Sequence, residues 1–411
     1  MRFRFSLRFL LILFTLLAIF LGLGGRYVYQ IKDQARRHRL AIANLEELRT
    51  FVRPATDKAK PPTTFESLIN RWVDNDAYPQ ANDCMIGMPL YIRLAPDEAE
   101  KRLEILRDVS GITELTIAIK RLTANAMQQL AAHQNLRYLK IECETIDPAA
   151  ALKLDQLKAL ETLIFREACS DEVIVAASNL PHLAELTIHI TQLGPRGAEA
   201  LGHIKSLKRI DLVAEDQELP DPAPFLRSLA AMPDLTEIKI SSFIAINDEA
   251  ADALSRIQTL KSVRIEYCPS VPDDFLAKLS RLKQMESLIV TLWSKEPANF
   301  APAPLAQCPK LRQIYFDHAL FTAQNLRAFE AHPALTHLVI RGEVPLSDIK
   351  SFLQNTPNCE LTIITPSAPT WGVTPESDGS QPEGAVYRWN AGKLETREPK
   401  WKAPWKPAPD A

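Results

Sequence analysis

The amino-acid sequence predicts an α/β protein in which stacked repeats form a curved solenoid behind an N-terminal transmembrane helix. Two observations predict this fold. An apolar pattern restarts about every 24 residues from Ile112 onward, and a short arginine-rich start is followed by an uncharged, mostly apolar run from Phe9 to Gly25. Repeated units of this kind predict a parallel sheet on the concave side and helices on the convex side.

Each repeat begins with a pattern close to Leu-x-x-Leu-x-Ile. In the unit that starts at Leu136, for example, Leu139 and Ile141 follow three and five places later. A strand this short cannot bury its apolar side chains alone, so neighbouring units must stack to make a continuous core. The unit starts are Ile112, Leu136, Leu160, Leu183, Leu207, Leu235, Leu260, Met285, Leu311, Leu335 and, in degenerate form, Asn358.

The second half of each unit predicts a helix of about ten residues. Residues suited to a helix N-cap recur at a similar place, at Thr123, Asp147, Asn247, Thr322 and near Ser347. The whole pattern resembles the leucine-rich repeat (LRR) family, and helices of this length resemble its ribonuclease-inhibitor-like and cysteine-containing subclasses. The resemblance implies a solenoid over residues 95–365 and, by the habit of the family, protein binding.

The ninth position of the repeats departs from the family pattern. An Asn or Cys is usual there, but Cys268 is the residue that fits. Because buried polar groups need hydrogen-bond partners, the turn carbonyls that Asn would satisfy must find other donors. We expect irregular loops over 215–224 and 294–304, where the period lengthens and prolines cluster.

The N-terminus predicts a single membrane anchor. Residues 1–8 form a basic flank, and residues 9–29 form the predicted transmembrane helix, whose 17 residues from Phe9 to Gly25 span roughly 26 Å of a ~30 Å hydrocarbon core. A cleaved secretory signal and a buried core helix are the alternatives, but no Ala-x-Ala site follows. Basic residues flank both sides of the run, so the side of the membrane that holds the repeats stays open. The arrangement resembles bacterial proteins in which one N-terminal span carries an LRR domain.

The other segments flank the repeats. Residues 30–64 predict a helical stalk and linker, broken at 53–64 by prolines, and residues 65–94 predict an N-terminal cap with an atypical first strand over Met85–Leu94. Residues 366–411 are rich in Pro and Trp and predict a largely disordered tail. Within this tail we expect Val386 and Trp389 to fold back onto the last repeat in a small hairpin that turns at 390–392. The alternative is a short recognition segment for a partner or a membrane interface.

Composition argues against several functions. A net charge of −2 and a pI near 6.5 offer no basic field for nucleic acid. The six cysteines form no Cys-x-x-Cys motif and predict buried free thiols, without structural zinc or haem. The eight histidines are scattered, and no hydrolase or phosphate-loop motif occurs. The sequence therefore predicts no enzyme activity, no metal and no cofactor.

The remaining candidate site is the face of the sheet that points away from the helices, here called the concave face. Its side chains come from the third, fifth and seventh positions of each repeat, because side chains alternate along a strand. Opposite charges fall on neighbouring strands in Glu185–Arg209–Glu237, Glu142–Arg166, Asp211–Lys239 and Asp317–Arg341. The residues predicted to contact a partner are Tyr138, Lys140, Arg166, His189, Arg209, Lys239, Arg264, Tyr315 and Arg341.

The sequence therefore predicts a non-catalytic, membrane-anchored LRR scaffold that binds a protein partner through the concave face and contacts the lipid bilayer through residues 9–29. The alternative is a module that binds a carbohydrate or another cell-envelope polymer. Such a site would use aromatic stacking platforms, and Tyr138 and Tyr315 are the aromatic residues predicted on this face. The partner, the oligomeric state and the biological process stay open.

Overall fold

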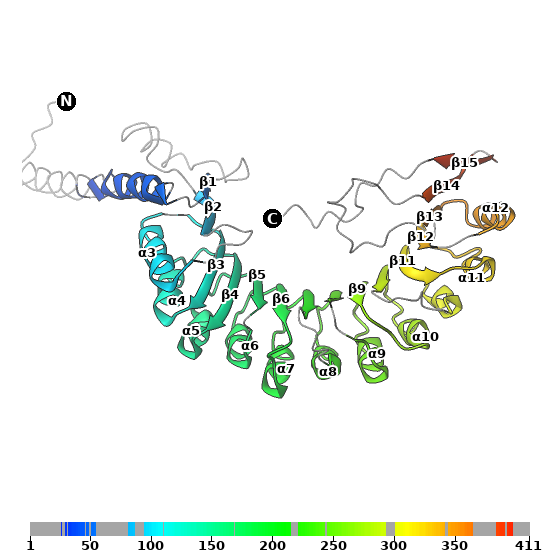
Figure 1. Cartoon of the computed structure of the whole chain (residues 1–411), viewed down its shortest axis with the longest axis horizontal. Coiled ribbons are helices and arrows are strands. Elements are labelled where there is room, and N and C mark those ends of the chain that lie inside the picture. Colours follow the sequence, from blue (N-terminus) through cyan, green and yellow to red (C-terminus); the bar gives the residue numbers. More distant parts are fainter. Residues whose placement is uncertain are drawn as a thin grey trace, which may run out of the picture. The chain divides into compact units, whose positions relative to one another are not determined.

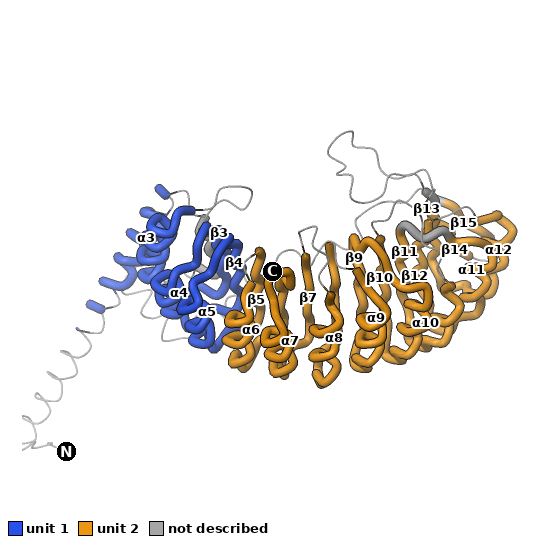
Figure 2. Tube along the Cα trace, turned by 60° about the horizontal axis from the view of Figure 1, so that its bottom comes forward, with its two compact units in different colours: residues 1–160 blue, residues 161–411 orange. Residues whose placement is uncertain are grey.

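A computed structural model describes the chain in two compact units, Met1–Leu160 (unit 1) and Glu161–Ala411 (unit 2), coloured separately in Figure 2. The described residues are most of 26–48, the strands at 51–54 and 81–86, residues 94–364 and the strands at 384–390 and 393–397. Residues 110, 168, 215–220, 243–244, 293–300 and 342–343 within these ranges are excepted.

Unit 1 contains the first repeats and their N-terminal flank. Its sheet has the order β1-β2-β3-β4, in which β1 is antiparallel to β2 and the other neighbours are parallel. The strands are β1 (Phe51–Pro54), β2 (Ala81–Ile86), β3 (Glu114–Leu122) and β4 (Tyr138–Ile146). The helices are α3 (Pro96–Leu106), α4 (Ala124–Leu130), α5 (Pro148–Leu152) and the 3₁₀ helix η1 (Lys153–Gln156).

Unit 2 continues the same alternation of strand and helix. Figure 1 shows its strands along the inner side of its arc and its helices along the outer side, as the sequence predicts. The strands are β5 (Thr162–Glu167), β6 (Glu185–His189), β7 (Arg209–Val213), β8 (Glu237–Ser241), β9 (Ser262–Cys268), β10 (Ser287–Leu292), β11 (Gln313–Leu320), β12 (His337–Arg341), β13 (Glu360–Ile364), β14 (Gly384–Asn390) and β15 (Lys393–Arg397). The helices are α6 (Asp171–Ala177), α7 (Pro195–Leu201), α8 (Ala223–Leu229), α9 (Asp248–Ser255), α10 (Phe275–Leu279), η2 (Ala303–Gln307), α11 (Ala323–Arg327) and α12 (Leu346–Asn355).

The strand register confirms the repeat pattern. From β6 to β13 the fourth positions of the repeats pair directly in parallel, beginning with Leu186, Ile210 and Ile238 and ending with Leu338 and Leu361. These side chains are at most 2% exposed. The apolar core is therefore a stack of equivalent positions between the sheet and the helices.

The helices are mostly shorter than the predicted ten residues. Those from α4 to α11 have five to eight residues, and α12 has ten. Most of them end at a small residue that still has helical backbone angles, after which the chain turns into the next strand. A repeat of about 24 residues leaves little room for a longer helix once its strand and two turns are formed.

The predicted N-caps are partly confirmed. The side chains of Thr123, Asn247 and Thr322 accept backbone N–H groups at the starts of α4, α9 and α11. Asp147 is the N-cap residue of α5 but does not cap it, because its carboxylate instead accepts Arg121 Nε at 2.7 Å. Ser347 lies inside α12, whose N-cap residue is Pro345.

Side-chain donors link backbone carbonyls of successive repeats. Thr259 Oγ1 donates to the carbonyl of Leu235 at 2.5 Å, and Ser206 Oγ donates to that of Leu183 at 2.8 Å. The Cys268 thiol donates to the carbonyl of Ile240 at 3.8 Å. Each donor lies one repeat after its acceptor. Cys268 occupies the ninth position, whereas Ser206 and Thr259 stand immediately before the next repeat begins.

The structure describes part of the predicted N-terminal segments. Residues 9–25 of the predicted transmembrane helix lie outside the described residues; among those described, no helix combines the length and apolarity needed to span a bilayer. Residues 32–45 are helical, as predicted for the stalk. The atypical first strand is β2, which begins four residues before the predicted Met85 and pairs in parallel with β3. At the end of the predicted range, Leu94 forms a bridge with Ile119, and residues 87–93 lie outside the described residues.

The C-terminal tail forms the hairpin that was predicted at 390–392 against the last repeat. Strand β14 pairs antiparallel with β13 and with β15, and Asn390 and Lys393 are register partners next to the turn. Val386 is buried, and Arg388 forms an ion pair with Glu360. The last parallel strand would otherwise present an unpaired edge, and the hairpin covers it. The rest of the predicted tail lies outside the described residues.

Candidate binding surface on the concave face

The concave face of unit 2 carries polar side chains on rigid strands. Alternation along each strand directs the fourth and sixth positions into the core and the third, fifth and seventh positions to the other face. Parallel pairing in register then places equivalent positions side by side. The result is a set of lateral rows, one for each repeat position.

The row of third positions forms an alternating charge ladder. Arg209 lies between two carboxylates, with its Nη1 atom 3.4 Å from Glu185 and its Nε atom 2.7 Å from Glu237. The three side chains are 42–49% exposed. This ladder confirms the predicted pairing of Glu185, Arg209 and Glu237, and solvent weakens each of its ion pairs.

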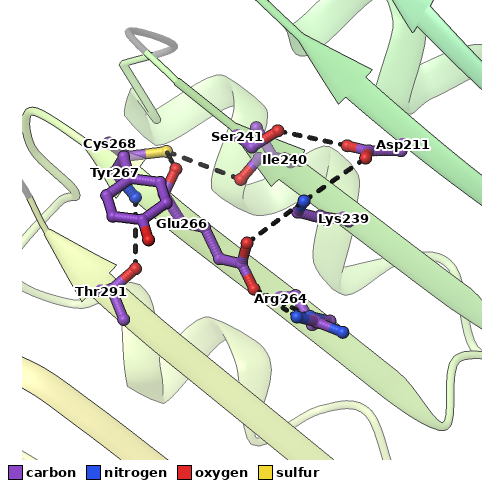
Figure 3. A network of polar contacts seen from close by, with 9 residues as sticks. All are labelled: Asp211, Lys239, Ile240, Ser241, Arg264, Glu266, Tyr267, Cys268 and Thr291. Atoms are coloured by element: carbon purple, nitrogen blue, oxygen red, sulfur yellow. Dashed lines mark hydrogen bonds and ion pairs between the residues drawn. The ribbon is translucent and has the colours of Figure 1, made fainter. Parts of the chain in front are cut away.

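The row of fifth positions is different. Here Asp211 neighbours Lys239, but the next partner in register is a second cation, Arg264 (Figure 3). Like charges that face each other on neighbouring strands destabilise a sheet. We call Asp211, Lys239, Ser241, Arg264, Glu266 and Tyr267 the Lys239 cluster.

Glu266 holds the two cations together. One of its oxygens accepts Arg264 Nε at 2.9 Å and Arg264 Nη2 at 2.6 Å, while the other lies 3.2 Å from Lys239 Nζ. Asp211 lies 3.5 Å from Lys239 Nζ and accepts the Ser241 hydroxyl at 3.2 Å. Burial raises the pKa of Asp211, and Lys239 lowers it less strongly. The carboxylates therefore set the positions of both cations.

Tyr267 lies in the same cluster but outside the three predicted positions. It is the extra residue of a β-bulge, because Thr291 pairs with Glu266 and Leu292 with Cys268. Its φ of 57° is left-handed, which is unfavourable for a residue with a bulky side chain. The Tyr267 amide donates to Thr291 Oγ1 at 3.2 Å (Figure 3). Tyr267 is 36% exposed.

A buried ion pair lies further along the sheet. Arg341 Nε donates to Asp317 at 2.7 Å, and both side chains are at most 4% exposed. Beside them β11 bulges, since Tyr315 pairs with Val339 and Leu320 with Arg341. Burial raises the pKa of Tyr315, and the Asp317 carboxylate adds to this. This pair confirms the predicted Asp317–Arg341 contact but places it inside the protein.

The nine predicted contact residues are therefore not equivalent. Arg166 and Arg209 are exposed, Lys239 and Arg264 are half-buried, and these four lie on the concave face of unit 2. Tyr138 and Lys140 are half-buried in unit 1, where Lys140 forms an ion pair with Glu142 at 3.0 Å. The predicted residues that the structure buries are His189, Tyr315 and Arg341.

Sequence reasoning missed two features of the Lys239 cluster. Glu266 was assigned to the seventh-position row, but its side chain reaches back to the fifth-position cations. Tyr267 follows it at the eighth position, which the period-two pattern of a strand does not assign to the concave face. A non-glycine bulge residue leaves no signal in the apolar periodicity, so the sequence could not have identified it.

The described residues provide no obvious metal centre. No group of three or more His, Cys, Asp or Glu side chains that could hold a metal ion occurs in the described part of the chain. Cys143, Cys169, Cys268, Cys308 and Cys359 are buried and form no disulfide, and burial raises the pKa of the Cys268 thiol to about 12. A thiol with so high a pKa is a poor nucleophile at neutral pH.

Stacked strand–helix units at this period and register form a repeat solenoid, as the sequence predicts. No family model matches the chain, and no curated protein is similar to it in sequence. Among solved structures, the chain is similar to the internalin InlF of Listeria monocytogenes, with 14% identity over 65% of this chain and 77% of that one and a TM-score of 0.40.

Two further structures are similar over part of their own length. Toll from Drosophila, in its complex with Spatzle, shares 14% identity over 68% of this chain and 42% of that one, with a TM-score of 0.47. TLR13 in its complex with the RNA ssRNA13 shares 15% identity over 66% of this chain and 48% of that one, with a TM-score of 0.40.

Proposed function

We propose that this protein is a non-catalytic scaffold that binds a partner protein through its concave face and is anchored in a membrane by residues 9–29. The observation that carries the binding proposal is the exposure of charged side chains on rigid strands. Arg209 is 49% exposed, and Lys239 and Arg264 are 31% and 30% exposed. Arginine and tyrosine supply many binding hot spots, and a rigid scaffold reduces the entropy lost on association.

The carbohydrate alternative has less support. Stacking on a sugar ring needs an exposed aromatic face, and Tyr315 is only 9% exposed. Tyr267 is the aromatic side chain that the Lys239 cluster offers, and it is surrounded by charged groups. A surface of charges on several strands suits a protein partner better than a neutral polymer.

Site-specific photo-crosslinking tests the binding proposal. A photoreactive amino acid replaces Ser262 on the concave face in one variant and Arg256 at the end of α9 in a matched control. We expect a discrete partner adduct from position 262 and none from position 256, with the adduct identified by mass spectrometry. Adducts from position 256 alone would contradict binding through the concave face.

Protease accessibility tests the membrane proposal separately. A C-terminally tagged chain should sediment with membranes and require detergent for release, because the uncharged run of residues 9–25 favours a bilayer. Digestion in intact cells would place the tag outside, and protection until permeabilisation would place it inside. Release by salt or alkaline carbonate alone would argue against an anchor.

A further inference from the structure

We propose that Lys239 and Arg264, with Tyr267 beside them, bind the carboxylate of an aspartate or glutamate side chain on the partner protein. This inference rests on the proposed function and names the chemistry that the concave face recognises. It is carried by three independent observations on the Lys239 cluster, which are the order of its charges, their depth and the backbone of Tyr267.

The order of the charges is the first observation. Arg209 is flanked by a carboxylate on each side, whereas Lys239 and Arg264 are direct register partners. A ladder that served only to stabilise the sheet would alternate in sign, because like charges opposite each other repel. Glu266 bridges the two cations from the neighbouring row, and an anion from outside that lies over both would be a second bridge.

The depth of the charges is the second observation. Glu266 is 13% exposed and Asp211 is 20% exposed, while the two cations are about 30% exposed. The acids therefore lie deeper than the cations, which they hold in position. A lysine ammonium has three donors, and the described residues place two carboxylates around Lys239. One donor direction therefore stays available for a ligand carboxylate.

The backbone of Tyr267 is the third observation. A bulge turns this residue into the left-handed region and holds it there through the Thr291 hydroxyl. Strained non-glycine residues and bulges often lie at functional sites, where they aim a side chain that would otherwise point elsewhere. The phenol of Tyr267 is a hydrogen-bond donor on the rim of the cluster and suits a carboxylate acceptor.

The charge of the cluster selects a carboxylate over a phosphate. Two cations and two carboxylates are close to neutral, so a monoanion can be accommodated while a dianion would meet Glu266 and Asp211. A nucleic-acid backbone would also meet the exposed Glu185 and Glu237 on the neighbouring row. A planar carboxylate can accept from Arg264 and Lys239 together.

Peptide display on the full chain tests the inference. The 411-residue chain is purified in a mild detergent because of its apolar N-terminus, and a library of random twelve-residue peptides is selected against it. We expect enriched peptides to carry Asp or Glu at a fixed position. Replacing that residue with Gln or Asn in the synthetic peptide should weaken binding at least tenfold.

Variants of the chain locate the contact. Lys239→Gln and Arg264→Gln should each lower the affinity for the acidic peptide about tenfold. Lys239→Arg keeps the charge and should retain the affinity within threefold. Arg256→Gln is the matched control, since it removes an exposed cation at the end of α9, away from the predicted contact residues, and it should change binding by less than twofold. Circular dichroism and unchanged urea midpoints verify folding.

Several outcomes would overturn the inference. Enriched peptides without acidic residues, or equal weakening of peptide binding by Arg256→Gln, would remove the carboxylate assignment and leave the proposed function standing. Tighter binding of a phosphoserine peptide than of the Glu peptide would replace carboxylate with phosphate. Binding of an oligouridylate that Lys239→Gln abolishes would make the surface a nucleic-acid site, and a failure to select any peptide would contradict both proposals.

Discussion

Two regions of the sheet, one over β6–β8 and one over β8–β12, contain the same kinds of charged residues in opposite arrangements. In the first region, Glu185, Arg209 and Glu237 alternate in sign and are nearly half exposed. In the second region, two cations are neighbours in the Lys239 cluster, and the Asp317–Arg341 pair is almost fully buried. The first arrangement is a surface ladder, and the second places charges where water screens them poorly.

An ion pair on this sheet therefore has no fixed contribution to stability. A solvated ladder contributes little and tolerates change, because water stabilises each charge when its partner is removed. A buried pair contributes specificity and depends strongly on both partners, because a single charge left behind is costly in a low-dielectric interior. Burial, rather than residue type, separates the two regions.

The largest expected effect comes from breaking the buried pair. Arg341→Leu leaves Asp317 buried without its guanidinium partner and should lower the free energy of unfolding by about 3–5 kcal/mol. Urea unfolding followed by circular dichroism measures this change. The double variant Asp317→Leu/Arg341→Leu is the control and should lose far less. A loss below about 1 kcal/mol in the single variant would mean that the pair behaves like the exposed ladder.

A smaller effect with the opposite sign is expected at the bulge. Tyr267→Gly removes the left-handed strain of a bulky residue and should raise the free energy of unfolding by about 1 kcal/mol. The same variant should lower the affinity for the acidic peptide. Tyr267→Phe keeps the strain and removes the hydroxyl, so it should lower peptide affinity with unchanged stability. Loss of stability in Tyr267→Gly would show that the aromatic ring is held by packing instead.

The exposed ladder should respond weakly. Arg209→Gln should lower the free energy of unfolding by at most about 1 kcal/mol, and the difference from wild type should vanish in about 1 M NaCl, where screening acts over ~3 Å. Parallel urea titrations at low and high salt measure both values. A larger loss that persists in high salt would erase the distinction between the two regions.

The smallest expected effect is a pH dependence confined to the Lys239 cluster. Because burial raises the folded pKa of Asp211, its protonated form contributes stability that is present below the ordinary aspartate pKa and is lost as pH rises through the raised value. The variant Asp211→Asn lacks this pH-dependent contribution to stability. Urea unfolding between pH 4 and 8 should show wild type losing stability relative to Asp211→Asn as pH rises, and parallel curves would contradict the prediction.

Much of the fold could be predicted from the apolar period alone. Positions such as Leu186 and Ile210 were assigned to the core because burial imposes a regular spacing, and the register confirms them. Capping was less predictable, since Asp147 and Asn247 occupy the same N-cap position but only Asn247 caps its helix. The presence of Arg121 beside Asp147 decides that difference.

For the candidate site, the sequence predicted which row each residue occupies but not how deeply its side chain is buried. Lys239, Arg264 and Arg209 were assigned to the concave face correctly, while Arg341 and Tyr315 share its rows yet are buried. Exposure depends on bulges and neighbouring loops, and neither follows from a period-two pattern. Tyr267 was missed for the same reason, because a bulge positions its side chain and the sequence pattern does not predict that bulge.

The repeat, its strand register and the apolar stack follow from the amino-acid sequence alone, because each is imposed locally by the need of every unit to bury the same positions against its neighbours. Which charges on the sheet are solvated and which are buried follows from contacts that form only in the folded chain. That choice depends on Glu266 reaching back to Lys239 and on the bulges at Tyr267 and after Tyr315. These are contacts between repeats, and no single repeat encodes them.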